Sequence, residues 1–274
     1  MIKLQNLNAG YKAKNPVLKD LTLSLEPNRI YGLLGSNGSG KTTLLNTLGG
    51  ALYPLGGECN VLGHNPADRK TEFLEQIMLI SDELELPAIS AEAFIESYSA
   101  FRPKFSSEQM TNYLNVMNFT FGTRLDKLSL GNRKKFMIAF ALASNPRLLL
   151  MDEPTNGLDI ESKQALRKIL VGLDLSEKII IISSHQVADI EDIISDVIIL
   201  REKSVILNST LDEIGEALQF GTTASVADPL YKDGLKAIGK SEGDYSDVDL
   251  ELLYVAMQSS DSVRNYLSSV ISKK

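Results

Sequence analysis

A glycine-rich segment in the first fifth of the chain has the residue types that bind phosphate groups. It reads Gly35-Ser36-Asn37-Gly38-Ser39-Gly40-Lys41-Thr42 and is followed by Thr43. Glycines allow backbone N–H groups to turn toward phosphate oxygens. In this pattern the Lys41 ammonium contacts the outer phosphates of a nucleotide, and the Thr42 hydroxyl contacts Mg²⁺. The segment therefore predicts a nucleotide-phosphate site, and the alternative is a glycine-rich structural turn.

An apolar run farther along the chain ends in two adjacent carboxylates. Residues 148–151 are all apolar and lead directly to Asp152 and Glu153. The pattern is typical of a buried parallel strand, and open α/β sheets bind ligands at the carboxyl ends of such strands. We expect Asp152 to bind Mg²⁺ and Glu153 to orient or deprotonate an attacking water. The alternative is a helix cap or a surface ion pair.

Two further side chains are candidates for nucleotide contacts. His185 follows another apolar run, Ile179–Ile182, so it is expected at the same sheet edge as Asp152, where it would contact a γ-phosphate. The alternative is a structural histidine. Tyr11 precedes a loop that leads into the sheet. Its ring either stacks on an adenine base or packs as an ordinary strand residue.

Short apolar runs predict the elements that position these residues in the first half of the chain. A helix is expected to begin around Gly40 and to run to Leu48, directly after the glycine-rich segment. The glycine pairs at 49–50 and 56–57 predict a loop region. The expected strands are Ile2 to Tyr11, Leu21 to Leu25, Ile30 to Leu34 and Ile77 to Ile80.

The second half of the chain changes from a helical region to alternating strands and helices. Residues 90–144 have mostly helical spacing. Residues 148–152 and 179–183 are expected to be adjacent parallel strands joined by a helix over 162–173, which is a βαβ unit. A hairpin is expected from 197 to 207. Beyond about Thr210 the sequence predicts two amphipathic helices, Asp249–Met257 and Ser262–Ile271.

Composition restricts the class of protein. The chain has 274 residues, is 43% apolar and carries one cysteine, Cys59, so a disulfide framework is excluded and a reducing cytosolic setting is expected. It shows no signal-peptide region, and no apolar run approaches the roughly 20 residues that span a bilayer. The net charge of −7 argues against a nucleic-acid partner, although Arg133-Lys134-Lys135 is a small candidate basic patch.

These motifs, in this order, resemble the nucleotide-binding subunits of ATP-binding cassette (ABC) transporters over about residues 1–208. The resemblance rests on GSNGSGKT at 35–42, LSLGN at 128–132, LLLMDE at 148–153, NGLD at 156–159 and His185. It implies an α/β fold with a P-loop NTPase core and parallel sheet, an N-terminal antiparallel β-subdomain and an inserted α-helical subdomain at about 84–144. Residues 209–274 would then be an accessory extension.

The resemblance also implies a mechanism. Two such subunits would close head-to-tail around two ATP molecules, and hydrolysis would release them. Ser129 and the backbone N–H of Gly131 would reach the γ-phosphate bound by the partner subunit, although Ser129 is equally suited to a simple helix N-cap. Asp159 would lie at the dimer seam. Tyr11 matches the adenine-stacking aromatic of the family.

The implied partners are a polytopic membrane subunit, which would dock on the helical region, and a second nucleotide-binding subunit, identical or not. The chain would be cytoplasmic and peripheral on the inner face of the cell membrane. Alternatives within the same superfamily are a soluble ATPase that acts on ribosomes or DNA and a weakly hydrolysing regulatory subunit.

Two positions depart from the family pattern. The usual LSGGQ signature reads LSLGN here, with Leu130 in place of a glycine and Asn132 in place of the glutamine. A bulky third residue occurs in an exporting branch, so the resemblance favours an exporter. Asp82 stands where the family has a glutamine that contacts Mg²⁺, so Asp82 is a candidate metal ligand.

Overall fold

Buried apolar runs from both halves of the chain assemble into one mixed sheet. The computed structural model describes residues 1–12 and 14–271. Within them the central sheet has six strands, parallel except for β9, which is antiparallel to β8. In spatial order they are β5 (Ile77–Ile80), β6 (Leu148–Asp152), β7 (Ile179–Ser184), β3 (Arg29–Gly35), β8 (Asp196–Arg201) and β9 (Ser204–Thr210).

The central strands are buried on both faces, which is why they are continuous apolar runs. In β7, Ile179 and Ile181 join one hydrophobic core while Ile180 and Ile182 join a second core. Strands β6 and β7 are parallel neighbours joined through the helix α6 (Ile160–Val171), as the βαβ prediction required. The predicted hairpin is confirmed as β8–β9.

A three-stranded antiparallel sheet packs against one of these cores. Its order is β2 (Leu18–Leu25), β1 (Ile2–Ala9) and β4 (Pro54–Val61). The loop predicted from the glycine pairs is confirmed at Gly49 and Gly50, which follow α1, but it is wrong for Gly56 and Gly57, which lie inside β4. Gly57 has φ +79°, and a Cβ there would lie 2.2 Å from the Asn6 carbonyl oxygen. The glycine therefore marks a bulge within a strand, not its absence.

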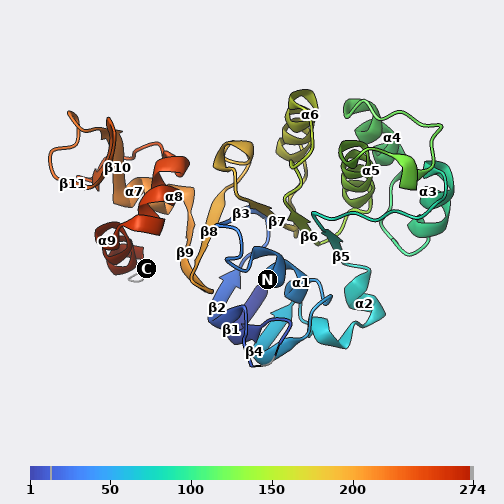
Figure 1. Cartoon of the computed structure of the whole chain (residues 1–274), viewed down its shortest axis with the longest axis horizontal. Coiled ribbons are helices and arrows are strands. Elements are labelled where there is room, and N and C mark those ends of the chain that lie inside the picture. Colours follow the sequence, from blue (N-terminus) through green and yellow to red (C-terminus); the bar gives the residue numbers. More distant parts are fainter. Residues whose placement is uncertain (13, 272–274) are drawn as a thin grey trace.

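Helices cover the central sheet and extend from it (Figure 1). The short helices α1 and α2 lie beside the antiparallel sheet, whereas α3, α4 and α5 gather at the opposite end of the molecule from the C-terminal elements. Phe94 contacts Phe136 and Phe140 edge-to-face, which joins α3 to α5. The bounds are α1 (Lys41–Leu48), α2 (Thr71–Leu74), α3 (Ala91–Ser99), α4 (Ser107–Val116) and α5 (Leu130–Ala143).

The C-terminal region contains more structure than the sequence predicted. The two expected helices are present as α8 (Leu250–Ser259) and α9 (Asp261–Ile271). A small antiparallel sheet and a further helix precede them. These are α7 (Leu211–Ala217), β10 (Leu218–Thr222), β11 (Pro229–Asp233) and β12 (Lys236–Lys240), with the sheet order β10-β12-β11. Strand β11 is half-buried to exposed throughout, so it lacks the apolar alternation that reveals a strand.

No helix in residues 1–12 and 14–271 is long and apolar enough to cross a membrane.

Candidate functional site

The glycine-rich segment forms the turn between β3 and α1. Gly40 has φ +109°, a conformation that favours glycine, and a Cβ there would lie 2.5 Å from a Leu18 methyl carbon. Lys41 is the first helical residue, and its Nζ donates a hydrogen bond of 2.8 Å to the Gly35 carbonyl oxygen. Ser39 Oγ is buried and has no partner within the described part of the chain. The segment thus presents a buried ammonium and an unused hydroxyl beneath a turn whose N–H groups suit an anion.

A cleft of about 300 Å³ opens above this turn. It brings the predicted phosphate and metal residues together. Its lining consists of Tyr11, Val17, Ser36, Asn37, Gly38, Gly40, Lys41, Thr42, Thr43, Asp82, Asp152 and Glu153.

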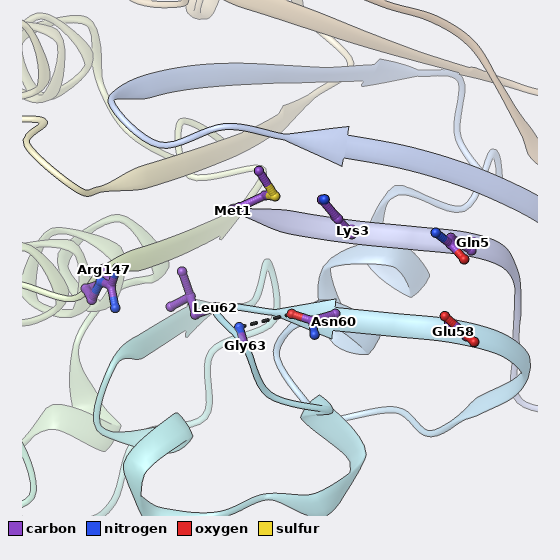
Figure 2. A pocket seen from close by; sticks show the side chains of 8 residues that line it. All are labelled: Met1, Lys3, Gln5, Glu58, Asn60, Leu62, Gly63 and Arg147. Carbon is purple, nitrogen blue, oxygen red and sulfur yellow. Dashed lines mark hydrogen bonds between the residues drawn. The ribbon is translucent and has the colours of Figure 1, made fainter.

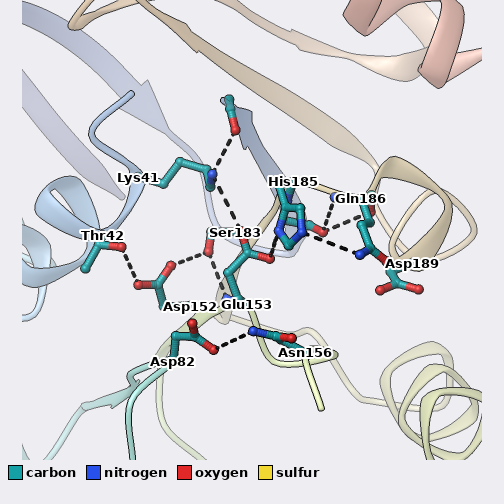
Figure 3. Close-up of polar contacts among 12 residues, drawn as sticks. Lys41, Thr42, Asp82, Asp152, Glu153, Asn156, Ser183, His185, Gln186 and Asp189 are labelled. Atoms are coloured by element: carbon teal, nitrogen blue, oxygen red, sulfur yellow. Dashed lines mark hydrogen bonds and ion pairs between the residues drawn. The ribbon is translucent and has the colours of Figure 1, made fainter. Parts of the chain in front are cut away.

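Asp152 lies at the carboxyl end of β6, as predicted, and is 3% exposed. The Thr42 hydroxyl donates to Asp152 Oδ2 at 2.6 Å (Figure 3), so the two oxygen groups expected at Mg²⁺ are neighbours. The Ser183 hydroxyl donates to the other carboxylate oxygen. No group of three or more acidic, histidine or cysteine side chains gathers around a common point in the described residues. One hydroxyl and one carboxylate nevertheless fit Mg²⁺, which usually takes one or two protein ligands beside phosphate and water.

Glu153 is the one non-glycine residue of the described cleft lining whose φ is positive. Its φ of +47° lies in the left-handed region, which costs energy for a residue with a side chain. Its N–H donates to Ser183 Oγ at 3.0 Å, and its carbonyl accepts from Lys134 Nζ at 2.6 Å. Its carboxylate lies 3.5 Å from Lys41 Nζ. The fold therefore holds this carboxylate at the inner end of the cleft, above the loop lysine.

His185 contacts the same carboxylate. Its Nδ1 lies 2.8 Å from Glu153 Oε2, and its Nε2 lies 3.4 Å from the Gln186 side-chain amide (Figure 3). The register pairs Asp152 with Ser183 on the neighbouring strand, which brings His185 beside Glu153. The imidazole side chain is 40% exposed, and His185 contacts the cleft through Glu153 without lining it.

The basic run on α5 is not a surface patch, so that prediction is wrong. Lys134 is fully buried, and Lys135 is 8% exposed. Lys134 Nζ donates to Asp82 Oδ1 at 2.7 Å as well as to the Glu153 carbonyl. No local pattern indicated this arrangement, because a run of basic residues on a helix is usually solvated. Asp82 does line the cleft, but its carboxylate contacts an ammonium and the Asn156 amide.

The remaining predicted residues lie at the rim or outside the cleft. The Tyr11 ring is 65% exposed, and its hydroxyl is 3.5 Å from the Asn46 amide. Ser129 caps α5, because its Oγ accepts from the Asn132 N–H at 3.3 Å. Neither Ser129 nor Gly131 lines the cleft. The N-terminus of α5 is therefore not part of the site formed by its own chain.

A larger hollow, of about 470 Å³, lies on the N-terminal sheet (Figure 2). Lys3, Gln5, Glu58 and Asn60 project into it from β1 and β4. None of the predicted site residues lines it, and Figure 2 marks one hydrogen bond among its described lining residues, from the Gly63 backbone N–H to Asn60 Oδ1. Volume alone therefore does not identify the functional cleft.

Comparisons with known proteins show the family to which the chain belongs. Residues 18–156 match the family described as ABC transporter. The bacitracin transport ATP-binding protein BcrA of Bacillus licheniformis is 31% identical over 221 residues, which cover 78% of this chain and 71% of that protein. The lantibiotic transport ATP-binding protein SrtF of Streptococcus pyogenes is 28% identical, with 77% of this chain and 92% of that protein covered.

A solved dimeric ATP-binding cassette, captured after hydrolysis with ADP and Pi, has the same fold. It superposes with a TM-score of 0.63 at 24% identity, covering 77% of this chain and 99% of that one.

The chain therefore belongs to the ABC transporter family. Its fold is the α/β P-loop fold that the sequence predicted, with a parallel-dominated central sheet and N-terminal antiparallel strands. It is an ATP-binding ATPase subunit of the kind that drives transporters.

Proposed function

We propose that this chain hydrolyses ATP in the described cleft and uses the cycle to drive an exporter through head-to-tail dimerisation. The observation that supports this most directly is the convergence of Lys41, Thr42, Asp152 and Glu153 on one cleft, although the loop and the two carboxylates are more than a hundred residues apart. The cleft therefore contains groups suited to bind phosphate, to bind a metal ion and to activate water.

The cleft residues have distinct roles in this proposal. The loop N–H groups and Lys41 bind the phosphates, and Thr42 and Asp152 hold Mg²⁺, which neutralises phosphate charge when bound. Glu153 accepts a proton from the attacking water. His185 fixes the orientation of that carboxylate and presents its exposed face to the γ-phosphate. Tyr11 stacks on adenine, and a metal role for Asp82 remains a prediction.

Dimerisation would complete the site. Ser129 and Gly131 lie outside their own cleft, and Ser129 is exposed, which supports a role at a nucleotide held by another subunit. The N-terminus of α5 carries a partial positive charge that favours an anion. Exposed apolar side chains flank this region, with Leu130 at 45% and Ile160 at 76% exposure. Such side chains suit a seam that is covered in the closed dimer.

The membrane subunit would dock on the helical region. Tyr98, Phe101 and Phe121 are 43%, 69% and 45% exposed there. Exposed aromatic side chains are typical of protein interfaces. Through this partner the chain would sit on the cytoplasmic face of the membrane. The named relatives transport bacitracin and lantibiotics, and together with the bulky Leu130 they favour export of a peptide-like cargo.

We also propose a division of the chain into domains. Residues 1–208 form the ATPase domain, residues 84–144 form its helical subdomain, and residues 209–274 form an accessory unit. Limited proteolysis that releases a stable fragment ending near residue 208 would support this division.

Glu153→Gln tests the hydrolytic role. The amide keeps the shape of the side chain but accepts no proton from water, so turnover should fall at least about a hundredfold. Because ATP still binds, the variant should elute as a dimer with ATP and as a monomer without it in size-exclusion chromatography. Wild-type turnover in this variant would exclude Glu153 as the base.

Ser129→Arg tests the contribution in trans. On the Glu153→Gln background, the added arginine should prevent the ATP-dependent dimer while leaving nucleotide affinity of the monomer unchanged. A dimer that forms normally would refute a role for Ser129 at the partner's nucleotide.

Purification of the tagged chain in mild detergent tests the transport role. Stoichiometric recovery of a polytopic membrane protein supports it. Recovery of ribosomes or DNA-associated proteins, without a membrane partner, would contradict it.

A further inference from the structure

Lys134 is a fully buried cation in the second turn of α5, directly beside the hydrolytic cleft. Removing an ammonium from water costs several kcal/mol unless charged and polar partners replace the lost hydration. Two such partners are present. Asp82 Oδ1 lies 2.7 Å from Lys134 Nζ, and the Glu153 carbonyl oxygen lies 2.6 Å away.

These partners come from different segments of the chain. Asp82 follows β5, Glu153 follows β6, and Lys134 lies on the helix that begins at Ser129. The loop after β6 contributes another contact, because the Asn156 amide donates to Asp82 Oδ1 at 3.3 Å (Figure 3). One side chain therefore ties two sheet-edge loops to the helix proposed to reach the partner's nucleotide.

The contact with Glu153 restrains a backbone in an unfavourable conformation. A non-glycine residue keeps a φ of +47° only where contacts with its surroundings hold the backbone in that conformation. Ser183 accepts from the N–H of Glu153, and the Glu153 carbonyl accepts from Lys134 Nζ at 2.6 Å and from the Asn156 N–H at 3.2 Å. Without the ammonium, the Glu153 carbonyl loses its shorter, charged donor and keeps only the longer hydrogen bond from the Asn156 N–H.

We propose that Lys134 is a positioning residue for ATP hydrolysis, with Asp82 as its counter-ion. Lys134 orients the Glu153 main chain so that the Glu153 carboxylate faces the cleft. The proposal rests on the proposed role of Glu153 in hydrolysis. Lys134 does not line the cleft, so its loss should change kcat and leave the KM for ATP nearly unchanged.

Lys134→Met and the double variant Lys134→Met/Asp82→Asn separate positioning from stability. Methionine keeps the length of the side chain and removes the ammonium, which leaves the Asp82 carboxylate without its counter-ion. The added Asp82→Asn change relieves that uncompensated charge but does not restore a donor to Glu153. Folding stability should therefore fall in the single variant and recover in the double variant.

In both variants kcat should fall roughly tenfold or more, because a hydrogen bond from a charged donor is lost next to the reacting group. The KM for ATP should stay within about threefold. If kcat recovers together with stability in the double variant, Lys134 is only structural and the proposal is overturned. If the single variant does not fold, the double variant is compared with Asp82→Asn alone, and equal kcat values in these two variants overturn the proposal.

Two controls complete the experiment. Arg29→Gln breaks another ion pair, between Arg29 and the buried Asp196. Arg29 is the first residue of β3, whereas the phosphate loop follows the last residue of that strand. It should reduce stability without changing kcat below its unfolding temperature. Glu153→Gln is assayed in parallel. If that variant is inactive and Lys134→Met is fully active, only the inference about Lys134 fails; if Glu153→Gln is fully active, the proposed function fails.

Discussion

Replacing Ser183 with alanine should damage both the stability and the activity of this protein. Ser183 is completely buried at the end of β7. Its hydroxyl donates to the Asp152 carboxylate and accepts from the Glu153 N–H at 3.0 Å. Ser183→Ala therefore removes one donor from a buried carboxylate and leaves a buried N–H without an acceptor.

The size of the effect follows from these two contacts. A hydrogen bond to a charged group contributes about 1.5–3 kcal/mol, and a stranded buried donor costs about 1–3 kcal/mol. Because the two effects share one side chain and do not add fully, we expect a loss of about 2.5–4 kcal/mol. For a chain of this size that corresponds to a fall in Tm of roughly 5–15 °C.

Ser184→Ala is the matched control. Ser184 is also buried, but its hydroxyl exchanges hydrogen bonds of 2.9 Å only with the Gln186 backbone. These partners are neutral and local, so the loss should be about 1 kcal/mol. Unfolding is followed by circular dichroism without nucleotide, because bound ATP would add stability of its own.

ATP turnover gives the second measurement. Ser183→Ala should lower kcat, because Asp152 and the Glu153 backbone both lose a restraint, while the phosphate loop still binds ATP. The reasoning is refuted if Ser183→Ala unfolds at the same temperature as Ser184→Ala and turns over ATP at the wild-type rate.

Two further predictions concern binding and pH. Lys41→Ala should weaken ATP binding about 10–100-fold in a fluorescence titration, because a charged contact to the phosphates is lost; unchanged affinity would contradict the phosphate-loop assignment. Burial raises the pKa of the Cys59 thiol from 9.0 to about 12. The folded protein should therefore resist alkylation by iodoacetamide at pH 9, whereas the unfolded chain reacts. As pH rises, the Cys59 thiol ionises first in the unfolded chain, so its contribution to folding stability is present below pH 9 and lost between about pH 9 and 12. Equal alkylation rates for the folded and the unfolded chain would contradict the raised pKa of this thiol.

Much of the cleft was predictable because its motifs are local. A strand, a glycine-rich turn and a helix follow one another without interruption from β3 to α1, so Lys41 and Thr42 have few alternative positions. Asp152 was placed by the same reasoning, since a buried apolar run can end at only one edge of a parallel sheet. The βαβ order then brought His185 to that edge.

Other elements were missed where the local signal is ambiguous. Gly56 and Gly57 are compatible with a loop or with a bulge, and only the pairing of β4 with β1 distinguishes them. The C-terminal strands β10 and β11 are short and largely half-exposed, so they lack a strong period-two pattern.

Consecutive residues alone were enough to predict the chemistry proposed for the cleft: a phosphate loop, a carboxylate expected to bind metal and an adjacent carboxylate suited to water activation. The tertiary structure decided which distant side chains support that chemistry. Ser183 is 31 residues from Asp152 and Lys134 is 52 residues from Asp82, and neither contact follows from a local pattern. Both depend on which strands are neighbours and on which face of α5 is buried, because hydrogen bonds form only between groups that long-range packing brings within about 3 Å.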